Sequence, residues 1–185
     1  KYIIIDEFQD TSLLRYNLIK EIKVSVGIVY CSENIDLTLE EMIKQALKAD
    51  TTLLSELAAE LWSSHTADEL KIEFDNLLST EANACFIIYC GDTAAGFAHC
   101  SLRADYVEGS SSSPTGYLEG IYIRQEHRGK GYAKELLREC EKWAAEKGCR
   151  EFASDCELEN GESIAFHNAA GFKEANRIVC FIKEL

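Results

Sequence analysis

The 185-residue sequence has no run approaching the roughly 18 consecutive apolar residues that a membrane span requires. Its N-terminus also lacks the basic, apolar and small-residue order of a signal peptide. Basic residues are scarce, because 19 lysines and arginines face 32 aspartates and glutamates, for a formal net charge of −13. This balance repels phosphate backbones and favours a cationic small molecule or a basic partner. We expect a cytoplasmic protein that binds neither a membrane nor nucleic acid.

The eight cysteines are scattered and include no C-x-x-C pair. Several stand at apolar-periodic positions, where a free thiol packs as a small hydrophobic group. We therefore expect reduced cysteines and no metal site, because the clustered ligand spacing of a zinc site is absent. With 46% hydrophobic and 28% charged residues the chain has globular proportions, and its length fits one domain, with two smaller ones as the alternative.

The first twelve residues place an apolar, strand-like run before acidic residues. Over about residues 1–25 the sequence resembles the magnesium-binding Asp-Glu motif of helicases related to UvrD and Rep. In that family a G-x-x-x-x-G-K-[ST] loop holds the nucleotide phosphates that share the metal, and this sequence has no such loop. The only methionine, Met42, opens a segment with the pattern of a complete domain. We expect a noncatalytic extension over residues 1–41 and the functional domain over residues 42–185.

Hydrophobic periodicity and turn residues predict the order of elements in that domain. Strands are expected over 43–49, 84–90, 95–106, 117–123, 150–154 and 178–182, and helices over 51–61, 67–78, about 133–147 and 160–171. Asp50 is the expected cap of the first helix, and Gly91-Asp92 the expected hairpin turn. The serine-rich segment 108–116 fits a mobile loop beside a site. This alternation predicts an α/β (α+β) fold with a mixed sheet.

A glycine-rich segment, Arg128-Gly-Lys-Gly-Tyr-Ala133, lies between the strand at 117–123 and the following helix. Glycines at such a place let a ligand approach unpaired backbone N–H groups and the positive end of the helix dipole. The turn suits a pyrophosphate group, although a tight turn without a ligand has the same pattern. Nucleoside triphosphates and dinucleotides fit poorly, because no serine or threonine follows Lys130 and the motif comes late in the chain.

The motif resembles the acetyl-CoA motif Arg/Gln-x-x-Gly-x-Gly/Ala of the GNAT N-acetyltransferase superfamily, which Arg128, Gly131 and Ala133 match. A second segment agrees, because Asn160 precedes a helix that ends at Gly171-Phe172. The resemblance covers residues 42–185 and implies the GNAT fold, a mostly antiparallel mixed sheet flanked by helices. It also implies acetyl-CoA as co-substrate, without a metal. The residues that it places at the coenzyme are Ile121, Tyr122, Ile123, Arg128, Gly129, Lys130, Gly131, Tyr132, Ala133 and Asn160.

Four separated segments are more specifically similar to the aminoglycoside 6'-N-acetyltransferases. They are Leu118-Glu-Gly-Ile-Tyr122, Phe152-Ala-Ser-Asp155, Tyr106-Val-Glu-Gly109 and the pair Trp62 and His65. This resemblance implies acetyl transfer to the 6'-amino group of an aminoglycoside antibiotic, resistance to the drug, and a homodimer. Three alternatives stay open: another amine such as a polyamine, peptide N-terminus or protein lysine, a noncatalytic acetyl-CoA sensor, or a helicase-derived interaction module that depends on residues 1–41.

The resemblance assigns roles to single residues. Glu119 binds the amine or relays its proton, with a strand-surface carboxylate as the alternative. Asp155 binds the aminoglycoside, or is an ordinary loop or capping aspartate. His167 stands where many members have a tyrosine that protonates the leaving thiolate, and solvent is the alternative acid. Backbone N–H groups around Gly120 to Ile123 would polarise the thioester carbonyl.

Three further residues are expected to line the acceptor cleft by the same resemblance. Trp62 and His65 form one wall, and Tyr106 lies opposite. A buried tryptophan is more often part of a core than of a binding site, so packing is the alternative for Trp62.

Overall fold

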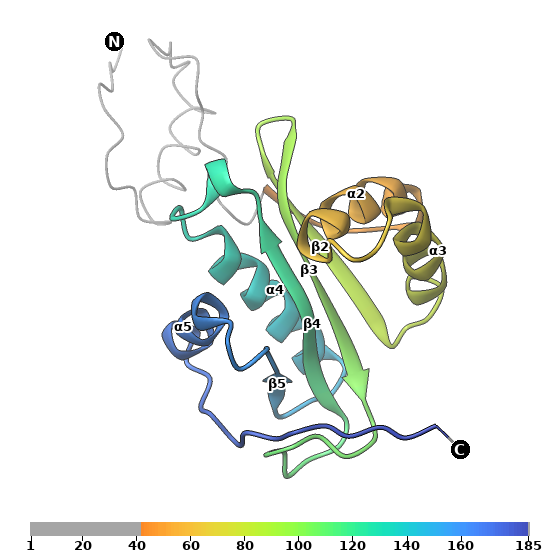
Figure 1. Cartoon of the computed structure of the whole chain (residues 1–185). Coiled ribbons are helices and arrows are strands. Elements are labelled where there is room, and N and C mark those ends of the chain that lie inside the picture. The colour runs from red at the N-terminus through yellow and green to blue at the C-terminus, as the bar shows by residue number, and fades with distance from the viewer. Residues whose placement is uncertain (1–41, 185) are drawn as a thin grey trace, which may run out of the picture. The chain divides into compact units, whose positions relative to one another are not determined.

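The computed structural model describes residues 42–184 of the chain, and its centre is a five-stranded sheet (Figure 1). The strands, in their order across the sheet, are β1 (Ile43–Gln45), β2 (Asn83–Cys90), β3 (Thr93–Arg103), β4 (Thr115–Ile123) and β5 (Phe152–Ser154). The first four strands pair antiparallel with their neighbours, whereas β5 runs parallel to β4. The expected mixed, mostly antiparallel sheet is confirmed. The expected extension over residues 1–41 lies outside the described residues and stays a prediction.

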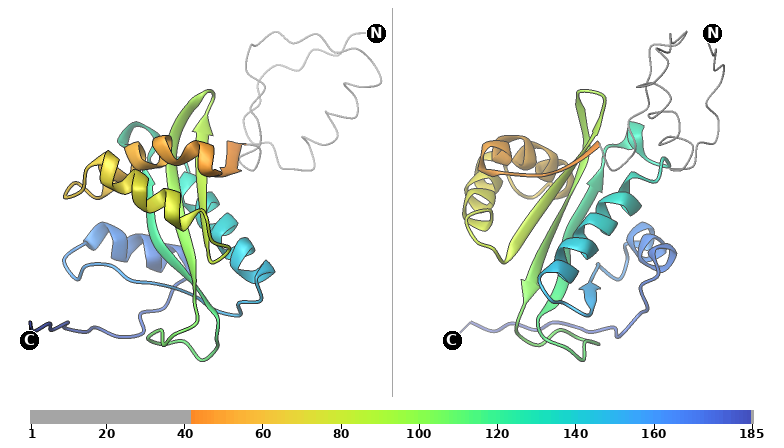
Figure 2. Two further views of the ribbon diagram at one scale, coloured as in Figure 1. Left: turned by 90° about the vertical axis from the view of Figure 1, so that its right-hand side faces the viewer. Right: turned by 180° about the vertical axis from the view of Figure 1, so that it is seen from behind.

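Helices cover both faces of the sheet (Figure 2). α2 (Thr51–Leu61) and α3 (Ala67–Leu77) lie on one face, and α4 (Tyr132–Glu146) and α5 (Gly161–Ala170) lie on the other. Two short 3-10 helices, η2 (Lys48–Asp50) and η3 (Gln125–His127), precede α2 and follow β4. The predicted α/β class is therefore confirmed.

Each helical layer buries an apolar stripe against the sheet. The α2 and α3 layer packs on one face of β3, where Leu54, Leu57, Ala58, Leu70 and Phe74 of the helices are buried together with Phe97 of the strand. On the other face α4 buries Leu136, Leu137, Cys140 and Ala144, four of the five positions that its period near 3.6 predicts, whereas the fifth, Ala133, is half-buried. Full burial of a side chain the size of leucine or phenylalanine stabilises the fold by about 1.5–3 kcal/mol. Both layers therefore hold the sheet that carries the site.

Several predicted element ends are wrong. The strand expected over 43–49 ends at Gln45, because η2 begins three residues later. The Asp50 carboxylate accepts a hydrogen bond from the Leu47 N–H at 2.8 Å and makes no cap bond to α2. The strand expected over 95–106 spans Thr93–Arg103 instead. Local propensity does not locate such ends, because hydrogen-bond partners elsewhere in the fold decide them.

The strand predicted over 178–182 does not form, since residues 172–184 contain neither helix nor strand. The large apolar side chains of Ile178, Val179, Phe181 and Ile182 are exposed. A sequence of high β-propensity becomes a strand only where a neighbouring strand supplies hydrogen bonds. This segment joins the sheet of the described residues at neither edge.

The serine-rich loop between β3 and β4 is tied to Glu151, the residue before β5. The Glu151 carboxylate accepts hydrogen bonds from the N–H groups of Ser111 and Ser112 at 2.9 and 2.7 Å. It also accepts from the hydroxyls of Ser110, Ser111 and Ser112. These bonds, with that of the Ser112 hydroxyl foremost, lower the pKa of Glu151 to about 2. The loop predicted as mobile is therefore anchored at its middle.

Candidate active site

The segment 128–133 forms a turn that leads into α4. Gly129 and Gly131 have φ angles of +78° and +82°, a conformation that favours glycine. Gly131 is the N-cap of α4, so this 15-residue helix points the positive end of its dipole at the turn. A Cβ atom built on either glycine would meet no other atom within 4 Å. The surface before the helix is therefore open to a ligand.

Arg128 connects this turn to the end of β4 and to α5. Its Nε donates a hydrogen bond to the Ile123 carbonyl oxygen at 3.0 Å, and its Nη1 lies 3.7 Å from Glu162 Oε2 in the first turn of α5. Asn160 is the N-cap of α5 and accepts a hydrogen bond from the Ser163 N–H at 3.0 Å. The residues expected at the coenzyme thus lie at the end of β4, in the turn, and at the starts of α4 and α5. These are Ile121, Tyr122, Ile123, Arg128, Gly129, Lys130, Gly131, Tyr132, Ala133 and Asn160.

One edge of β4 is open where the strand approaches the turn. The pairing of β4 with β5 covers only Gly116, Tyr117 and Leu118. From Gly120 to Ile123, the strand pairs with β3 alone among the strands that the structure describes. The backbone groups of this edge can therefore meet a ligand, in the stretch where the sequence predicts an interrupted ladder.

Glu119 lies at a β-bulge in the same strand. The register of β3 and β4 shifts between His99 and Cys100, which leaves Glu119 as the extra residue of β4. Its Oε1 accepts hydrogen bonds from the Ser101 hydroxyl and, at 3.2 Å, from Arg103 Nε. Its Oε2 accepts one from Arg103 Nη2 at 2.8 Å. The Glu119 carboxylate is therefore paired with a cation of the protein itself.

Asp155 follows β5 and joins the same network through Tyr117. The Tyr117 hydroxyl donates a hydrogen bond to Asp155 Oδ1. Burial and this bond raise the pKa of Tyr117, so its hydroxyl is protonated near neutral pH. The Arg103 guanidinium stacks on the same ring, with its Cζ 3.3 Å from the ring centroid. The structure therefore brings Glu119 and Asp155 together around Arg103.

Trp62 follows α2 and packs against the strand beside Glu119. A Cβ atom on Gly120 would lie 2.7 Å from Trp62 Cζ2, so only glycine lets the indole come this close. The ring also packs edge-on against Phe97, with centroids 6.0 Å apart. Because the side chain is half-buried, Trp62 both closes the core and offers an aromatic surface next to Glu119.

The structure leaves Tyr106 and His65 at the periphery. Tyr106, in the loop after β3, is 81% exposed, and its hydroxyl donates a hydrogen bond to Glu108 at 2.8 Å. His65 is exposed in the turn after α2, where its N–H donates to the Trp62 carbonyl oxygen at 3.0 Å. Their place in the acceptor cleft stays a prediction.

One ring nitrogen of His167 in α5 makes a hydrogen bond, and the other has no partner among the described residues. Its Nδ1 lies 2.7 Å from the Ser163 carbonyl oxygen, which can only accept, so Nδ1 carries a proton. Its Nε2 is buried and has no hydrogen-bond partner within residues 42–184. The Phe172 ring packs edge-on against the imidazole, with centroids 5.1 Å apart. In the neutral ring Nε2 is therefore an acceptor, and it can donate only in the imidazolium form.

Sequence reasoning missed Ser101 and Arg103. Their spacing of two on one strand places them on the same face, which is a signal that the sequence contains. That the Glu119 carboxylate reaches both side chains depends on the bulge, which the sequence alone does not locate. Two residues before Ser101 on the same strand, His99 is buried, and this burial lowers the pKa of its imidazole to about 4. His99 Nε2 lies 3.1 Å from Asn83 Oδ1.

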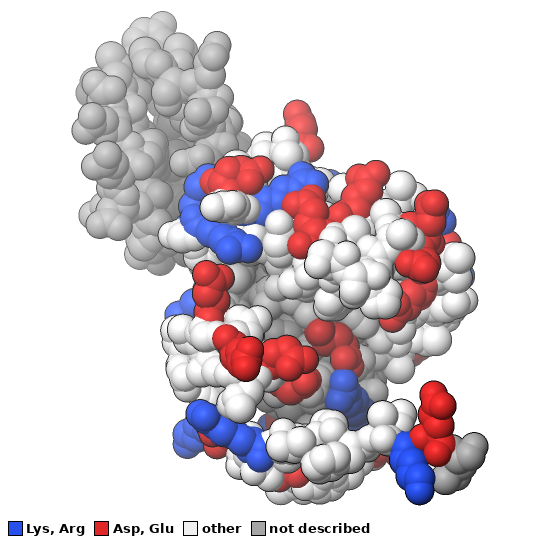
Figure 3. All heavy atoms as spheres, viewed as in Figure 1, with Lys and Arg blue, Asp and Glu red and all other residues white. Residues whose placement is uncertain are grey.

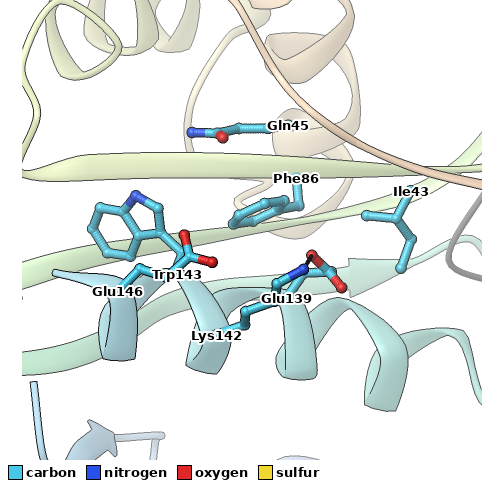
Figure 4. A pocket seen from close by; sticks show the side chains of 7 residues that line it. All are labelled: Ile43, Gln45, Phe86, Glu139, Lys142, Trp143 and Glu146. Carbon is cyan, nitrogen blue, oxygen red and sulfur yellow. Dashed lines mark ion pairs between the residues drawn. The ribbon is translucent and has the colours of Figure 1, made fainter. Parts of the chain in front are cut away.

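Acidic side chains gather on one face of the molecule. Figure 3 shows acidic side chains gathered around the hollow in the middle of the face, between the α2 and α3 layer and α5. A separate hollow of about 200 Å³ lies between β1, β2 and α4, and Trp143 and Phe86 help to line it (Figure 4). None of the predicted site residues lines that second hollow.

Residues 42–184 hold no group of three His, Cys, Asp or Glu side chains arranged for a metal ion. No helix in the same range is long and apolar enough to cross a membrane. The cysteines in this range are free thiols.

Comparisons with known proteins identify the family of this chain. The model of the Acetyltransferase (GNAT) family matches residues 47–172. Aminoglycoside N(6')-acetyltransferase type 1 of Salmonella typhimurium is 39% identical over 127 residues, which are 69% of this chain and 88% of that protein. The protein of the same name from Acinetobacter haemolyticus is 38% identical over 143 residues, or 77% of this chain and 98% of that one.

Solved structures give the same relation. AAC(6')-Iy in complex with the bisubstrate analog CoA-S-monomethyl-acetylneamine is 37% identical, with a TM-score of 0.74 over 77% of this chain and 97% of that chain. AAC(6')-Iy in complex with CoA is also 37% identical, with a TM-score of 0.75 over 77% and 94%. This chain therefore belongs to the GNAT acetyltransferase family, and within it to the aminoglycoside N(6')-acetyltransferases.

Proposed function

We propose that this chain transfers the acetyl group of acetyl-CoA to the 6'-amino group of aminoglycoside antibiotics, and so confers resistance to them. The observation that carries the proposal is one open strand edge with a different site at each end. At one end stands the glycine turn at the start of α4, and at the other stand the carboxylates of Glu119 and Asp155. The anionic coenzyme and the polycationic aminoglycoside would therefore bind next to each other along β4.

The turn and the end of β4 would hold the coenzyme. The positive end of the α4 dipole and the backbone N–H groups around Gly129 and Gly131 suit the pyrophosphate. The open edge from Gly120 to Ile123 offers hydrogen bonds to an extended arm and an N–H for the carbonyl oxygen. Acetyl-CoA supplies the acetyl thioester, and these groups would aim it toward Glu119.

The acceptor would bind through its ammonium groups. Glu119 and Asp155 provide two carboxylates, and Trp62 provides an aromatic surface beside them. An ammonium group must lose a proton before its nitrogen can attack a carbonyl carbon. Glu119 would receive that proton, directly or through water.

His167 would return a proton to the departing thiolate. Because Nδ1 donates to Ser163, the proton must come from Nε2 of an imidazolium ring. The orphaned Nε2 is the buried polar atom of this helix without a protein partner in the described residues, which suits a group that meets a substrate.

We also propose that the protein works as a homodimer in the cytoplasm, where acetyl-CoA is available. The support for a dimer is the apolar segment 178–182, where Phe181 and Ile182 are 92% and 100% exposed. Strand-forming residues left without a partner strand favour pairing with a second copy of the chain.

A thiol-release assay tests the proposed function. Purified protein with acetyl-CoA and kanamycin or tobramycin should release CoA, and a panel with a polyamine and a lysine peptide should give little turnover. Binding of acetyl-CoA without transfer to any aminoglycoside would contradict the proposal. Expression in a susceptible bacterium should raise the inhibitory concentration of the same drugs, and expression of Glu119→Gln should not.

A further inference from the structure

Arg103 is paired with the Glu119 carboxylate, which is proposed to bind the acceptor. Its guanidinium spans Glu119, with Nη2 at 2.8 Å from Oε2 and Nε at 3.2 Å from Oε1. Ser101 donates a third hydrogen bond to Oε1. A carboxylate has about four lone-pair sites, so this arrangement leaves about one for any other donor.

The same guanidinium is linked to the second carboxylate indirectly, through Tyr117. It lies against the Tyr117 ring, whose hydroxyl donates to Asp155. Although burial lowers the pKa of Arg103, the hydrogen bond and charge of Glu119, with smaller contributions from Tyr117 and Asp155, raise it on balance. This one permanent cation therefore offsets one of the two negative charges proposed to bind the ammonium groups of the acceptor.

The ion pair is accessible. The side chains of Arg103 and Glu119 are 40% and 26% exposed. An ion pair that is partly open to water costs less to break than a fully buried pair. Arg103 is also the last residue of β3, so the chain beyond it is a loop rather than a paired strand. Its long side chain can leave Glu119 without disturbing the sheet.

We propose that Arg103 stands in for the ammonium group of the acceptor, and that an aminoglycoside must displace it from Glu119 to bind. The inference rests on the proposed function and adds a competing internal cation to it. Two cations cannot share the last site on Glu119 without like-charge repulsion. The apparent affinity for the acceptor is then reduced by the fraction of molecules in which Arg103 holds Glu119. Coenzyme binding is unaffected, because the glycine turn lies at the other end of β4.

Calorimetric titration of kanamycin into the free protein tests the displacement without turnover. Arg103→Met keeps an apolar stem and removes the charge, and its dissociation constant for kanamycin should fall about tenfold. Arg138→Met is the matched control, since Arg138 is an exposed arginine of α4 that pairs with Glu135. It should leave the constant unchanged. In the background of Glu119→Gln, adding Arg103→Met should bring no gain.

A role for Arg103 in orienting Glu119 predicts a different effect of Arg103→Met on kanamycin binding. If Arg103 orients Glu119 and stays in place, Arg103→Met will weaken kanamycin binding or leave it unchanged, which overturns the proposal. Wild-type turnover is measured in parallel, because an enzyme that acetylates aminoglycosides yet shows no gain in Arg103→Met refutes the displacement alone. Absence of wild-type turnover refutes the proposed function and the displacement with it.

A measurement on the wild-type protein covers the case in which Arg103→Met does not fold. The Arg103 Nε–H resonance in a ¹⁵N NMR spectrum is assigned by its loss in Arg103→Lys. Saturating kanamycin should shift or broaden it, and acetyl-CoA alone should not. A resonance that keeps its position with kanamycin bound would overturn the proposal.

Discussion

Replacing Gly131 with alanine tests whether the turn before α4 binds the coenzyme. At its φ of +82° an alanine is strained, at a cost of about 1–2 kcal/mol. A Cβ atom there meets no other atom within 4 Å, so this strain is the main cost to the free protein. For a domain of this size we expect the melting temperature to fall by about 2–8 °C.

The added methyl group would also obstruct the surface where the pyrophosphate is proposed to bind. A loss of about 1.4 kcal/mol in binding corresponds to a tenfold change. We therefore expect the KM for acetyl-CoA to rise about tenfold or more in Gly131→Ala. The KM for kanamycin should stay near its wild-type value. Thiol release at saturating kanamycin measures the first constant, and circular dichroism on heating measures the stability.

Gly148 provides the matched control for strain. It has a φ of +88° and open space around it, but it follows the opposite end of α4. Gly148→Ala should lose about the same stability and leave the KM for acetyl-CoA unchanged. Equal KM values in the two variants would refute the assignment of the turn to the coenzyme.

Four further predictions follow from the site and its surroundings. Glu119→Gln should lower kcat/KM for kanamycin by about a hundredfold with little change in the KM for acetyl-CoA, and an unchanged rate would remove Glu119 from the chemistry. Burial lowers the pKa of His99 to about 4, from 6.5 in the unfolded chain. Between pH 6.5 and 4 the unfolded chain therefore binds a proton that the folded protein does not. Urea denaturation should show that His99 lowers the free energy of unfolding by on the order of 3 kcal/mol across this range. In His99→Gln that slope should flatten. Phe181→Asp should convert a dimer to a monomer in light scattering, and a monomeric wild type would contradict the dimer. Removing residues 1–41 should leave kcat and both KM values unchanged, whereas lost turnover would assign this segment to the active unit.

Much of the fold was predictable because its signals are local. Apolar residues at a spacing of three and four gave α3 and α4 to within a residue or two, and Gly91-Asp92 marked the hairpin between β2 and β3. The segment 178–182 has equally strong strand composition, yet it forms no strand. Composition reports which residues tolerate an extended backbone, whereas a strand also requires a neighbour.

The two ends of the proposed site also differ in whether the local sequence or the tertiary structure defines them. The sequence by itself determined the form of the proposed coenzyme end, because two glycines and a helix N-terminus within six consecutive residues place an open turn at the positive end of a helix dipole. Only the tertiary structure decided the acceptor end. A one-residue bulge at Glu119, where the register with β3 shifts between His99 and Cys100, places the carboxylate against Arg103, a partner 16 residues away. Strand register is a long-range property, and a shift of one residue would turn the carboxylate to the other face of the sheet.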